Sequence, residues 1–318
     1  MRVIRNLSAV PEELQNGVMT IGNFDGVHLA HQAIIQKVVK EAKEAGAKAI
    51  VMTFDPHPQQ VLHPERKHFY LITSLEEKIK ILSEMEVDAA IVVAFSREFS
   101  KTTAEAFSRD IICGKLHPVK VLIGHDYTFG RGKEGKPDYL KAQGEKYGFA
   151  VEVISAVETE GVIVSSTQVR NAVLAGNVAL AAKLLGRPYS LSGHVVEGDR
   201  RGRDIGFPTA NIEPEKLLIP SRGVYAVFVE TETQRYMAAL NIGFNPTFSE
   251  EKRITIEVHI LDFNGHLYGR KLFISFIDRI RDEKKFEGHD LLVAQIKRDV
   301  EQTREILEGH THPSRDSG

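Results

Sequence analysis

The stretch Val18–His31 reads VMTIGNFDGVHLAH, and it decides the fold of the first half of the chain. Its first four residues form a short apolar run that ends at Gly22, which is typical of a buried strand. An apolar stripe with helical spacing follows between His31 and Ala45. A strand that leads through a glycine-rich turn into a helix is typical of a parallel α/β sheet.

The same alternation of strand and helix patterns continues to about residue 186. The helix pattern that starts at Ser74 has Glu77 three residues later, which completes a capping box. The sequence therefore predicts an α/β domain with a doubly wound parallel sheet over residues 1–186, and such sheets bind ligands at the carboxyl ends of their strands. The predicted strands are Val18–Ile21, Ala47–Phe54, Ala89–Ala94, Val119–Ile123 and Val151–Ile154, and the predicted helices are His31–Ala45, Ser74–Met85, Thr103–Ile112 and Val178–Leu185.

Beyond Gly186 the pattern changes to short strands separated by clusters of Gly, Asn and Pro. Apolar and polar residues alternate over 254–260, and an apolar run covers Leu272–Ile277. This pattern predicts an antiparallel β-barrel or sandwich over residues 187–308. A terminal helix over about 289–307 is expected to close this domain, and the polar residues 309–318 are expected to form a disordered tail. The helix is expected to pack through Leu291, Leu292, Ile296, Val300 and Ile306.

The composition excludes several classes of protein. The 318 residues include 41 Lys and Arg against 43 Asp and Glu, so the chain lacks the basic excess of a dedicated nucleic-acid binder. The single cysteine, Cys113, excludes an internal disulfide and a cysteine-cluster metal site. No apolar run reaches the roughly 20 residues that span a bilayer, and the first residues lack the apolar core of a signal peptide. We therefore expect a cytoplasmic monomer or weak homo-oligomer without nucleic-acid or membrane partners.

Two segments of the first half have residues suited to phosphate. The two glycines of Gly22–Gly26 allow close approach to a ligand, and the following helix directs free N–H groups to the same place. His28 and His31 share one face of its first turn. In Ser165–Arg170 (SSTQVR), hydroxyls begin a helix and an arginine follows one turn later. The alternatives are a plain turn with two surface histidines, a poorly supported zinc site, and an ordinary helix cap with a solvated arginine.

Four segments of the first half resemble, in order, the motifs of the FAD synthetase branch of the nucleotidyltransferase superfamily. These segments are Gly22–His31, Thr53–Pro58, Gly124–Gly130 and Ser165–Arg170. One departure is Ala30, which stands where the family usually has glycine. A methyl group there is harmless if the residue is helical with negative φ, and would crowd the nucleotide if the backbone must come very close.

The resemblance implies an FMN adenylyltransferase, in which the phosphate of FMN attacks the α-phosphorus of ATP and pyrophosphate leaves. It implies that His28 and His31 stabilise charge on the transferring phosphorus, and that Arg170 acts with Ser166 and Thr167 on the departing pyrophosphate. Asp126 is expected to hold a polar part of the flavin or its ribityl chain; the alternative is a turn-forming aspartate. The residues expected to contact nucleotide are Gly22, Asn23, Phe24, Asp25, Gly26, Ser165, Ser166 and Thr167.

The second half resembles riboflavin kinases, through the signature Pro208-Thr209-Ala210-Asn211 and the segments 241–248, 256–263 and 280–286. Thr209 and Asn211 are two apart, so on a strand they face the same way and offer oxygen ligands suited to Mg²⁺. Glu257 matches the catalytic glutamate, which orients the ribityl hydroxyl and takes its proton late; the alternative is a solvent-facing strand residue. Flavin contacts are expected from Asn241 and Arg281.

The Gly- and Arg-rich stretch before this signature is expected to form a loop that closes over phosphates, although a flexible surface loop is the alternative. Its expected contact residues are Gly193, Gly198, Arg201, Gly202 and Gly206.

Taken together, both halves resemble the bacterial bifunctional riboflavin kinase/FMN adenylyltransferases, which implies ATP as co-substrate of both steps together with Mg²⁺. The activity implied is phosphorylation of riboflavin to FMN, followed by adenylylation of FMN to FAD. Two alternatives stay open. The first is a monofunctional riboflavin kinase with a degenerate adenylyltransferase module. The second is a non-catalytic flavin-binding regulatory protein.

Overall fold

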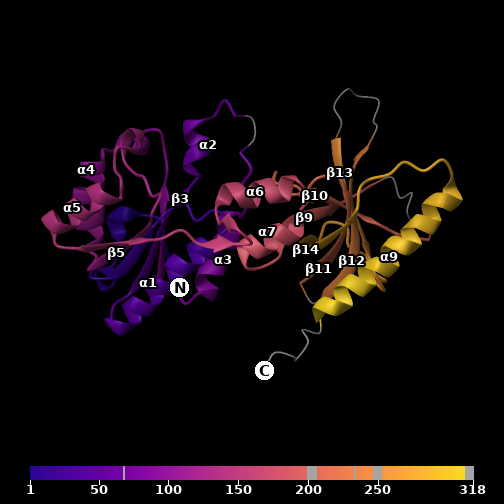
Figure 1. The fold of residues 1–318 in the computed structure, drawn as a ribbon, viewed down its shortest axis with the longest axis horizontal. Helices are drawn as coiled ribbons and strands as arrows, with labels where there is room; N and C mark the ends of the chain where they lie inside the picture. Colours follow the sequence, from indigo (N-terminus) through magenta and orange to yellow (C-terminus); the bar gives the residue numbers. More distant parts are fainter. Residues whose placement is uncertain (67–68, 199–205, 233, 246–252, 312–318) are drawn as a thin grey trace. The chain divides into compact units, whose positions relative to one another are not determined.

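The computed structural model describes residues 1–66, 69–198, 206–232, 234–245 and 253–311 (Figure 1). By their contacts the residues form two compact units, Met1–Ser166 and Thr167–Gly318. Each unit has its own sheet. The difference in sequence pattern between the two halves therefore corresponds to a difference in architecture.

The first unit is built on a six-stranded sheet with the order β1-β4-β3-β2-β5-β6, in which all neighbouring strands are parallel. The predicted doubly wound parallel sheet is confirmed. The edge strand β1 was not predicted, because three residues are too few to show a pattern. Strand β2 lies between β3 and β5, where the strand order changes direction. The strands are β1 Arg2–Ile4, β2 Val18–Ile21, β3 Ala49–Asp55, β4 Ala89–Ala94, β5 Lys120–Gly124 and β6 Ala150–Ile154.

The helices of this unit begin where the sequence places capping residues. Ser74 caps α3 and Glu77 closes the predicted capping box, and Thr103 caps α4 by accepting from Ala106 N–H. The helix expected over 103–112 continues as a π-helix, η4, to Leu116. The helices are α1 Leu29–Glu44, α2 Pro58–Leu62, α3 Leu75–Glu84, α4 Ala104–Ala106, η4 Phe107–Leu116 and α5 Pro137–Tyr147. Smaller elements are η1 Leu7–Ala9, η2 Glu12–Leu14, η3 Phe99–Lys101, η5 Arg131–Lys133 and the hairpin β7 Glu158–Thr159 with β8 Val162–Ile163.

The central strands bury both of their faces. On one face Met19, Ile50 and Met52 belong to the largest apolar core cluster. On the other face Val18 packs with residues of α1 such as Val38. Burial on both sides explains why the central strands of this unit are continuous apolar runs rather than alternating patterns.

The second unit contains a closed barrel with the order β10-β13-β12-β11-β14-β9. Every neighbouring pair is antiparallel, including the pair of β9 with β10 that closes the wall. Of the two folds predicted for this half, the antiparallel barrel is therefore confirmed and the sandwich is not. The strands are β9 Tyr189–Val196, β10 Ala210–Pro214, β11 Gly223–Glu230, β12 Arg235–Asn245, β13 Arg253–Ile260 and β14 Lys271–Arg281.

The terminal helix α9 (His289–Thr311) packs on β11, β12 and β14 (Figure 1). The expected packing face is partly wrong, because Leu291 is 61% exposed. The buried positions include Asp299, Thr303 and Leu307. A buried carboxylate is stable there because Arg281 pairs with it across the helix–barrel contact. The helix also includes residues 309–311 of the expected tail.

Two short helices, α6 (Ser166–Leu174) and α7 (Val178–Leu185), lie in the sequence between the strands of the parallel sheet and the strands of the barrel. Helix α7 packs on β9 and β14, so contacts group it with the barrel. The predicted domain boundary at residue 186 lies after these helices. The apolar spacing of a helix shows which side is buried, but not which sheet covers it.

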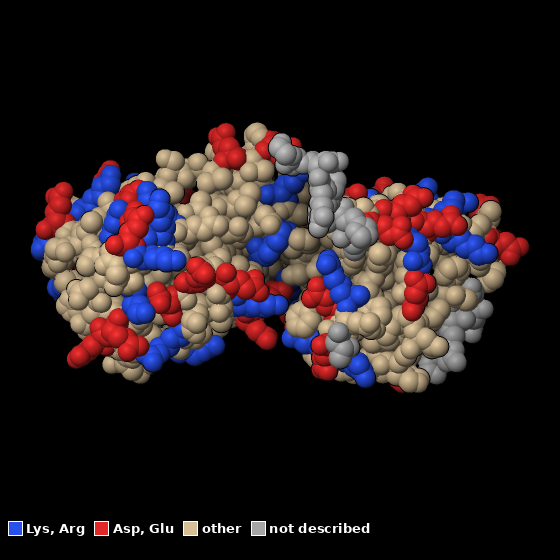
Figure 2. Space-filling view, turned by 90° about the horizontal axis from the view of Figure 1, so that it is seen from below, with Lys and Arg blue, Asp and Glu red and all other residues tan. Residues whose placement is uncertain are grey.

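The surface carries charges of both signs. Figure 2 shows Lys and Arg interspersed with Asp and Glu on the face it draws, over both units. Among the described residues, no helix is both long enough and apolar enough to cross a membrane.

Candidate functional sites

The turn between β2 and α1 has a strained backbone. Phe24, Gly26 and Val27 have φ of 48°, 87° and 39°, all in the left-handed region. Glycine accepts this conformation readily, whereas a β-branched residue such as Val27 rarely does. A Cβ on Gly26 would also lie 3.0 Å from the Ile72 side chain. Strained backbone persists where the surroundings hold it, and it is concentrated at functional sites.

The backbone of this turn is held by polar side chains from several other segments. Lys78 Nζ and Thr53 Oγ1 both donate to Asn23 O, at 2.7 and 3.0 Å. The Gly26 N–H donates to Thr73 Oγ1 at 3.0 Å. Gln32 Nε2 donates to Val27 O and Ser166 Oγ donates to Asp25 O, each at 2.8 Å. The carboxylate of Asp25, which is 1% exposed, accepts from the N–H groups of Ile72 (3.0 Å) and Thr73 (3.2 Å). Ser166 thus holds the turn, in addition to its predicted contact with phosphate.

The two predicted histidines are brought together at the end of the turn. His28 is 4% exposed and caps α1, its Nδ1 accepting from the His31 N–H at 3.4 Å. The two rings stack with centroids 3.6 Å apart, and the Phe24 ring meets His31 edge to face at 5.1 Å. Imidazoles beside a helix N-terminus are well placed to contact phosphate oxygens.

The surroundings of His31 favour its neutral imidazole. Its Nδ1 is buried and has no hydrogen-bond partner among the described residues. Burial is the main cause that lowers the pKa of His31 well below its ordinary value, and the charges of His28 and Lys78 add to it. A neutral ring keeps one N–H donor and one acceptor. His31 can therefore donate one hydrogen bond to a phosphate oxygen while its ring remains uncharged.

Ala30 meets the condition under which its methyl group is harmless. It is the second residue of α1 and is absent from the described residues with positive φ. The departure from the usual glycine is therefore accommodated by ordinary helical backbone.

We expect Ala30→Gly to bring no gain in FAD formation. Glycine is less favourable than alanine in a helix by up to about 1 kcal/mol, so the thermal unfolding temperature should fall slightly. The rate of FMN adenylylation should stay within about twofold of the wild-type rate. A rise of tenfold or more in that rate would show that the methyl group obstructs the nucleotide.

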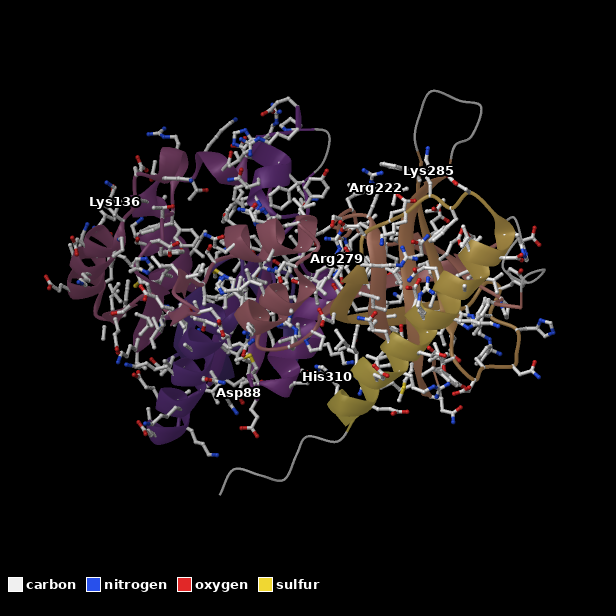
Figure 3. The ribbon with its side chains drawn as sticks, turned by 45° about the vertical axis from the view of Figure 1, so that its right-hand side comes forward. Asp88, Lys136, Arg222, Arg279, Lys285 and His310 are labelled. Carbon is white, nitrogen blue, oxygen red and sulfur yellow. The ribbon has the colours of Figure 1, made fainter. Side chains whose placement is uncertain are left out.

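The other predicted motifs of the first unit also lie at the carboxyl edge of the sheet. Residues 53–58 end β3 and residues 124–130 follow β5, and parallel strands bring such segments to one edge. Figure 3 shows Asp88, which directly precedes β4, on the side of the unit opposite Lys136, which directly precedes α5. Asp126 is exposed in the segment after β5, and its flavin contact remains a prediction.

The predicted pyrophosphate residues start helix α6. Ser166 is its first residue and Arg170 stands about one turn further along. By contacts, Thr167 and Arg170 are grouped with the second unit. Their contacts with pyrophosphate, and that of Ser165, remain predictions.

Tyr127, in the segment after β5, has a buried hydroxyl with no partner among the described residues. Its ring stacks on Phe129 with centroids 5.5 Å apart, and burial raises the pKa of the hydroxyl. A buried polar atom without a partner destabilises the fold.

We expect Tyr127→Phe to raise the free energy of unfolding of the first unit by about 1 kcal/mol, because it removes the unpartnered hydroxyl and keeps the ring. Tyr189→Phe is the matched control, because the buried Tyr189 hydroxyl donates to Leu218 O at 2.5 Å. That substitution should destabilise the barrel by a similar amount. Urea unfolding of both variants measures the effect. Equal destabilisation by both would mean that the Tyr127 hydroxyl has a partner in solution.

In the barrel, three predicted site residues form one row across neighbouring strands. Glu257 of β13 is the register partner of Asn211 on β10 and of Asn241 on β12. Residues directly opposite one another point to the same face, with Cβ atoms about 4.5–5.5 Å apart. Their neighbours Ile256 and Val258 are buried in the core, so the row faces away from it. The topology thus brings together predicted metal, catalytic and flavin residues.

His259 supports this row, and the sequence interpretation missed it. It is two residues from Glu257 and therefore on the same face of β13. Its Nδ1 bonds to Pro208 O at 2.9 Å, and its ring meets Phe207 edge to face at 5.4 Å. His259 therefore positions the segment that carries Thr209 just before β10 begins. The alternation of residues 254–260 was the signal that could have identified it.

The predicted phosphate loop is shorter than expected. Gly193 lies inside β9, paired with Pro214 and Leu272, so the loop begins only after Val196. A Cβ at Gly198 would lie 1.9 Å from Asn211 Nδ2, so a larger residue there would displace the Asn211 side chain. Gly206 has φ of 85° and open space around it. Arg201 and Gly202 lie outside the described residues.

Arg281, predicted to contact flavin, is used to attach α9. Its Nε and Nη2 donate to the carboxylate of Asp299 at 2.9 and 2.7 Å, and its Nη1 donates to Asp282 O at 2.8 Å. The side chains of Arg281 and Asp299 are only 16% and 6% exposed. All three nitrogens thus have partners within the protein, and the flavin contact of Arg281 remains a prediction.

The oxygen donors beside the row fit a magnesium ion that is carried by a nucleotide. Thr209 and Asn211 offer a hydroxyl and an amide oxygen, while the described residues contain no group of three His, Cys, Asp or Glu side chains that could hold a metal. Mg²⁺ in such sites keeps water and phosphate oxygens as most of its ligands. Two neutral protein oxygens match that requirement.

Comparisons with known proteins match each half of the chain to a family. The family profile of FAD synthetase matches residues 10–168, and that of riboflavin kinase matches residues 185–307. A bifunctional riboflavin kinase/FMN adenylyltransferase from Listeria monocytogenes serovar 1/2a is 40% identical over 290 residues, covering 91% of this chain and 92% of that protein. The protein of the same name from Escherichia coli K12 is 39% identical over 315 residues, which is 99% of each chain.

A solved structure has the same architecture. It is described as a macrolide-efflux protein from Streptococcus pneumoniae, and it matches with a TM-score of 0.86 and 36% sequence identity. The match covers 95% of this chain and 98% of that chain.

Proposed function

The chain belongs to the family of bifunctional riboflavin kinase/FMN adenylyltransferases, and on this premise we propose which residues perform each of its two reactions. The enzyme phosphorylates riboflavin to FMN and then adenylylates FMN to FAD, with ATP as co-substrate. The barrel is proposed to perform the first step and the parallel α/β unit the second. The observation that supports this division most directly is the row Asn211–Glu257–Asn241, in which a carboxylate is the register partner of two amide side chains.

In the kinase step, Glu257 accepts a hydrogen bond from the terminal ribityl hydroxyl of riboflavin and orients it toward the γ-phosphorus of ATP. A carboxylate is far too weak a base to deprotonate an alcohol beforehand, so it takes the proton late, as the new P–O bond forms. The bond between the γ-phosphorus and the β-phosphate oxygen breaks, and ADP leaves. Thr209 and Asn211 would hold Mg²⁺, which when bound neutralises charge on the phosphates. The loop that begins after Val196 is proposed to exclude water from the reaction.

In the adenylyl step, a phosphate oxygen of FMN attacks the α-phosphorus of ATP. The bond from the α-phosphorus to the bridging oxygen breaks, and pyrophosphate leaves. His28 and His31 donate hydrogen bonds where negative charge develops, beside the free N–H groups at the start of α1. Ser166, Thr167 and Arg170 are proposed to hold the pyrophosphate. No covalent enzyme intermediate is needed, since positioning and charge stabilisation drive both steps.

We propose that the protein acts in the cytoplasm as a monomer or weak homo-oligomer. Its substrates are small molecules, so neither step requires a nucleic acid or a membrane. A single partly buried cysteine, Cys113, is compatible with a reducing compartment.

Purified protein incubated with riboflavin, ATP and Mg²⁺, followed by chromatography of the flavins, tests the proposal. FAD as the product supports both assignments. FMN as the sole product would show that the adenylyltransferase module is degenerate. Unchanged riboflavin, with flavin retained on the protein, would indicate the binding protein instead.

A further inference from the structure

Lys78 is a buried lysine near the N-terminus of a helix, where a positive charge is unfavourable. It is 5% exposed and lies in the first turn of α3, where the helix dipole opposes a positive charge. Burial lowers the pKa of its ammonium group, while the charges of Asp25 and Asp55 raise it. Buried lysines are rare unless the fold provides partners for them.

The partners of Lys78 are the strained turn and the end of β3. Its Nζ donates to Asn23 O at 2.7 Å and to Thr53 Oγ1 at 3.2 Å. The Thr53 hydroxyl donates to the same carbonyl at 3.0 Å, so the three groups form a closed triangle. This carbonyl directly precedes Phe24, where the left-handed backbone begins.

We propose that Lys78 is a positioning residue for adenylyl transfer, which fixes the Asn23 carbonyl and thereby the turn that carries His28 and His31 to the start of α1. The inference rests on the adenylyl transfer proposed above for this site. A turn with two non-glycine residues at positive φ relaxes when a bond that holds it is lost. Displacement of catalytic groups by about 1 Å can reduce a rate about 100-fold.

The charge of Lys78 has a second consequence that a structural role alone would not have. Asp25 in the turn and Asp55 on β3 attract this charge, while it disfavours protonation of His31 on α1, beside His28. Loss of the charge should therefore raise the pKa of His31. Because the neutral ring is the active form, the acid limb of the pH profile for FAD formation should move to higher pH.

The test compares Lys78→Met, Lys78→Arg and Thr53→Val in the full-length enzyme. Lys80→Met is the matched control, since Lys80 is exposed on the same helix. For Lys78→Met we expect kcat for FMN to FAD to fall about 10- to 100-fold, with the acid limb moved upward. Riboflavin kinase activity of the same sample should stay at the wild-type level, which shows that the protein is folded. Lys78→Arg should keep the acid limb of the wild type, and Thr53→Val should lower kcat without moving it.

Unchanged kcat and an unchanged acid limb in Lys78→Met would overturn the inference. If Lys78→Met fails to fold, Lys78→Arg and Thr53→Val decide: wild-type kcat in Thr53→Val, or an acid limb moved upward in Lys78→Arg, would contradict it. Failure of the proposed function would look different, because the wild-type enzyme itself would then form no FAD from FMN.

Discussion

Replacement of Glu257 by glutamine should nearly abolish the formation of FMN from riboflavin and leave the conversion of FMN to FAD intact. Glutamine keeps the shape of the side chain and can still accept a hydrogen bond, but it cannot take the hydroxyl proton. Loss of a general base lowers kcat by about 10²- to 10⁴-fold. The measurement is the rate of FMN formation with saturating ATP, beside the rate of FAD formation when FMN is supplied.

Glu213→Gln provides the matched control for this prediction. Glu213 is an exposed residue of β10 that lies two residues beyond Asn211 and is paired with His194 of β9, outside the row. It should keep both activities. Kinase activity near the wild-type level in Glu257→Gln would remove Glu257 from the reaction, and loss of both activities in a folded protein would contradict independent sites.

Replacement of His28 by alanine should have the opposite effect, so that FMN accumulates. Removal of a donor that stabilises charge in a transition state lowers kcat by about 10²- to 10³-fold. The rate of FMN formation by the barrel should be unchanged. The ratio of FMN to FAD after incubation with riboflavin and ATP reports the effect directly.

His28 also caps α1, and a second variant separates this role from catalysis. Asparagine is among the best N-capping residues, whereas replacement of a good cap by alanine destabilises a helix by about 1 kcal/mol. We therefore expect His28→Asn to unfold at a higher temperature than His28→Ala, yet to be similarly poor in FAD formation. Recovery of FAD formation in His28→Asn would reduce His28 to a capping residue.

Much of the fold could be predicted, because each class of strand leaves a different pattern in the sequence. Strands buried on both faces read as apolar runs, as in Ala89–Ala94, whereas a barrel strand with one exposed face alternates, as in residues 254–260. The packing face of α9 was harder, because Asp299 is buried only through a partner on another strand. The apolar pattern identifies buried hydrophobic residues, and it does not identify buried ion pairs.

The site residues likewise include some that a local sequence pattern reveals and others that only the tertiary structure reveals. His28 and His31 could be paired from their spacing on one helix. The row of Asn211, Glu257 and Asn241 depends on strand register, which no short motif reveals. Lys78 was missed because a lysine in a charged helix such as LEEKIK normally faces solvent, and only the tertiary structure places it under the turn.

The cross-strand row has a consequence for which changes the barrel can tolerate. Side chains alternate between the two faces of a strand, so a slip of one residue turns each of them to the opposite face. A deletion of one residue within β12 or β13 would exchange Asn241 or Glu257 with a neighbour from the hydrophobic interior. We therefore expect this domain to tolerate insertions and deletions only in its connecting hairpins, because the arrangement of the proposed kinase residues depends on the pairing of all the strands around them.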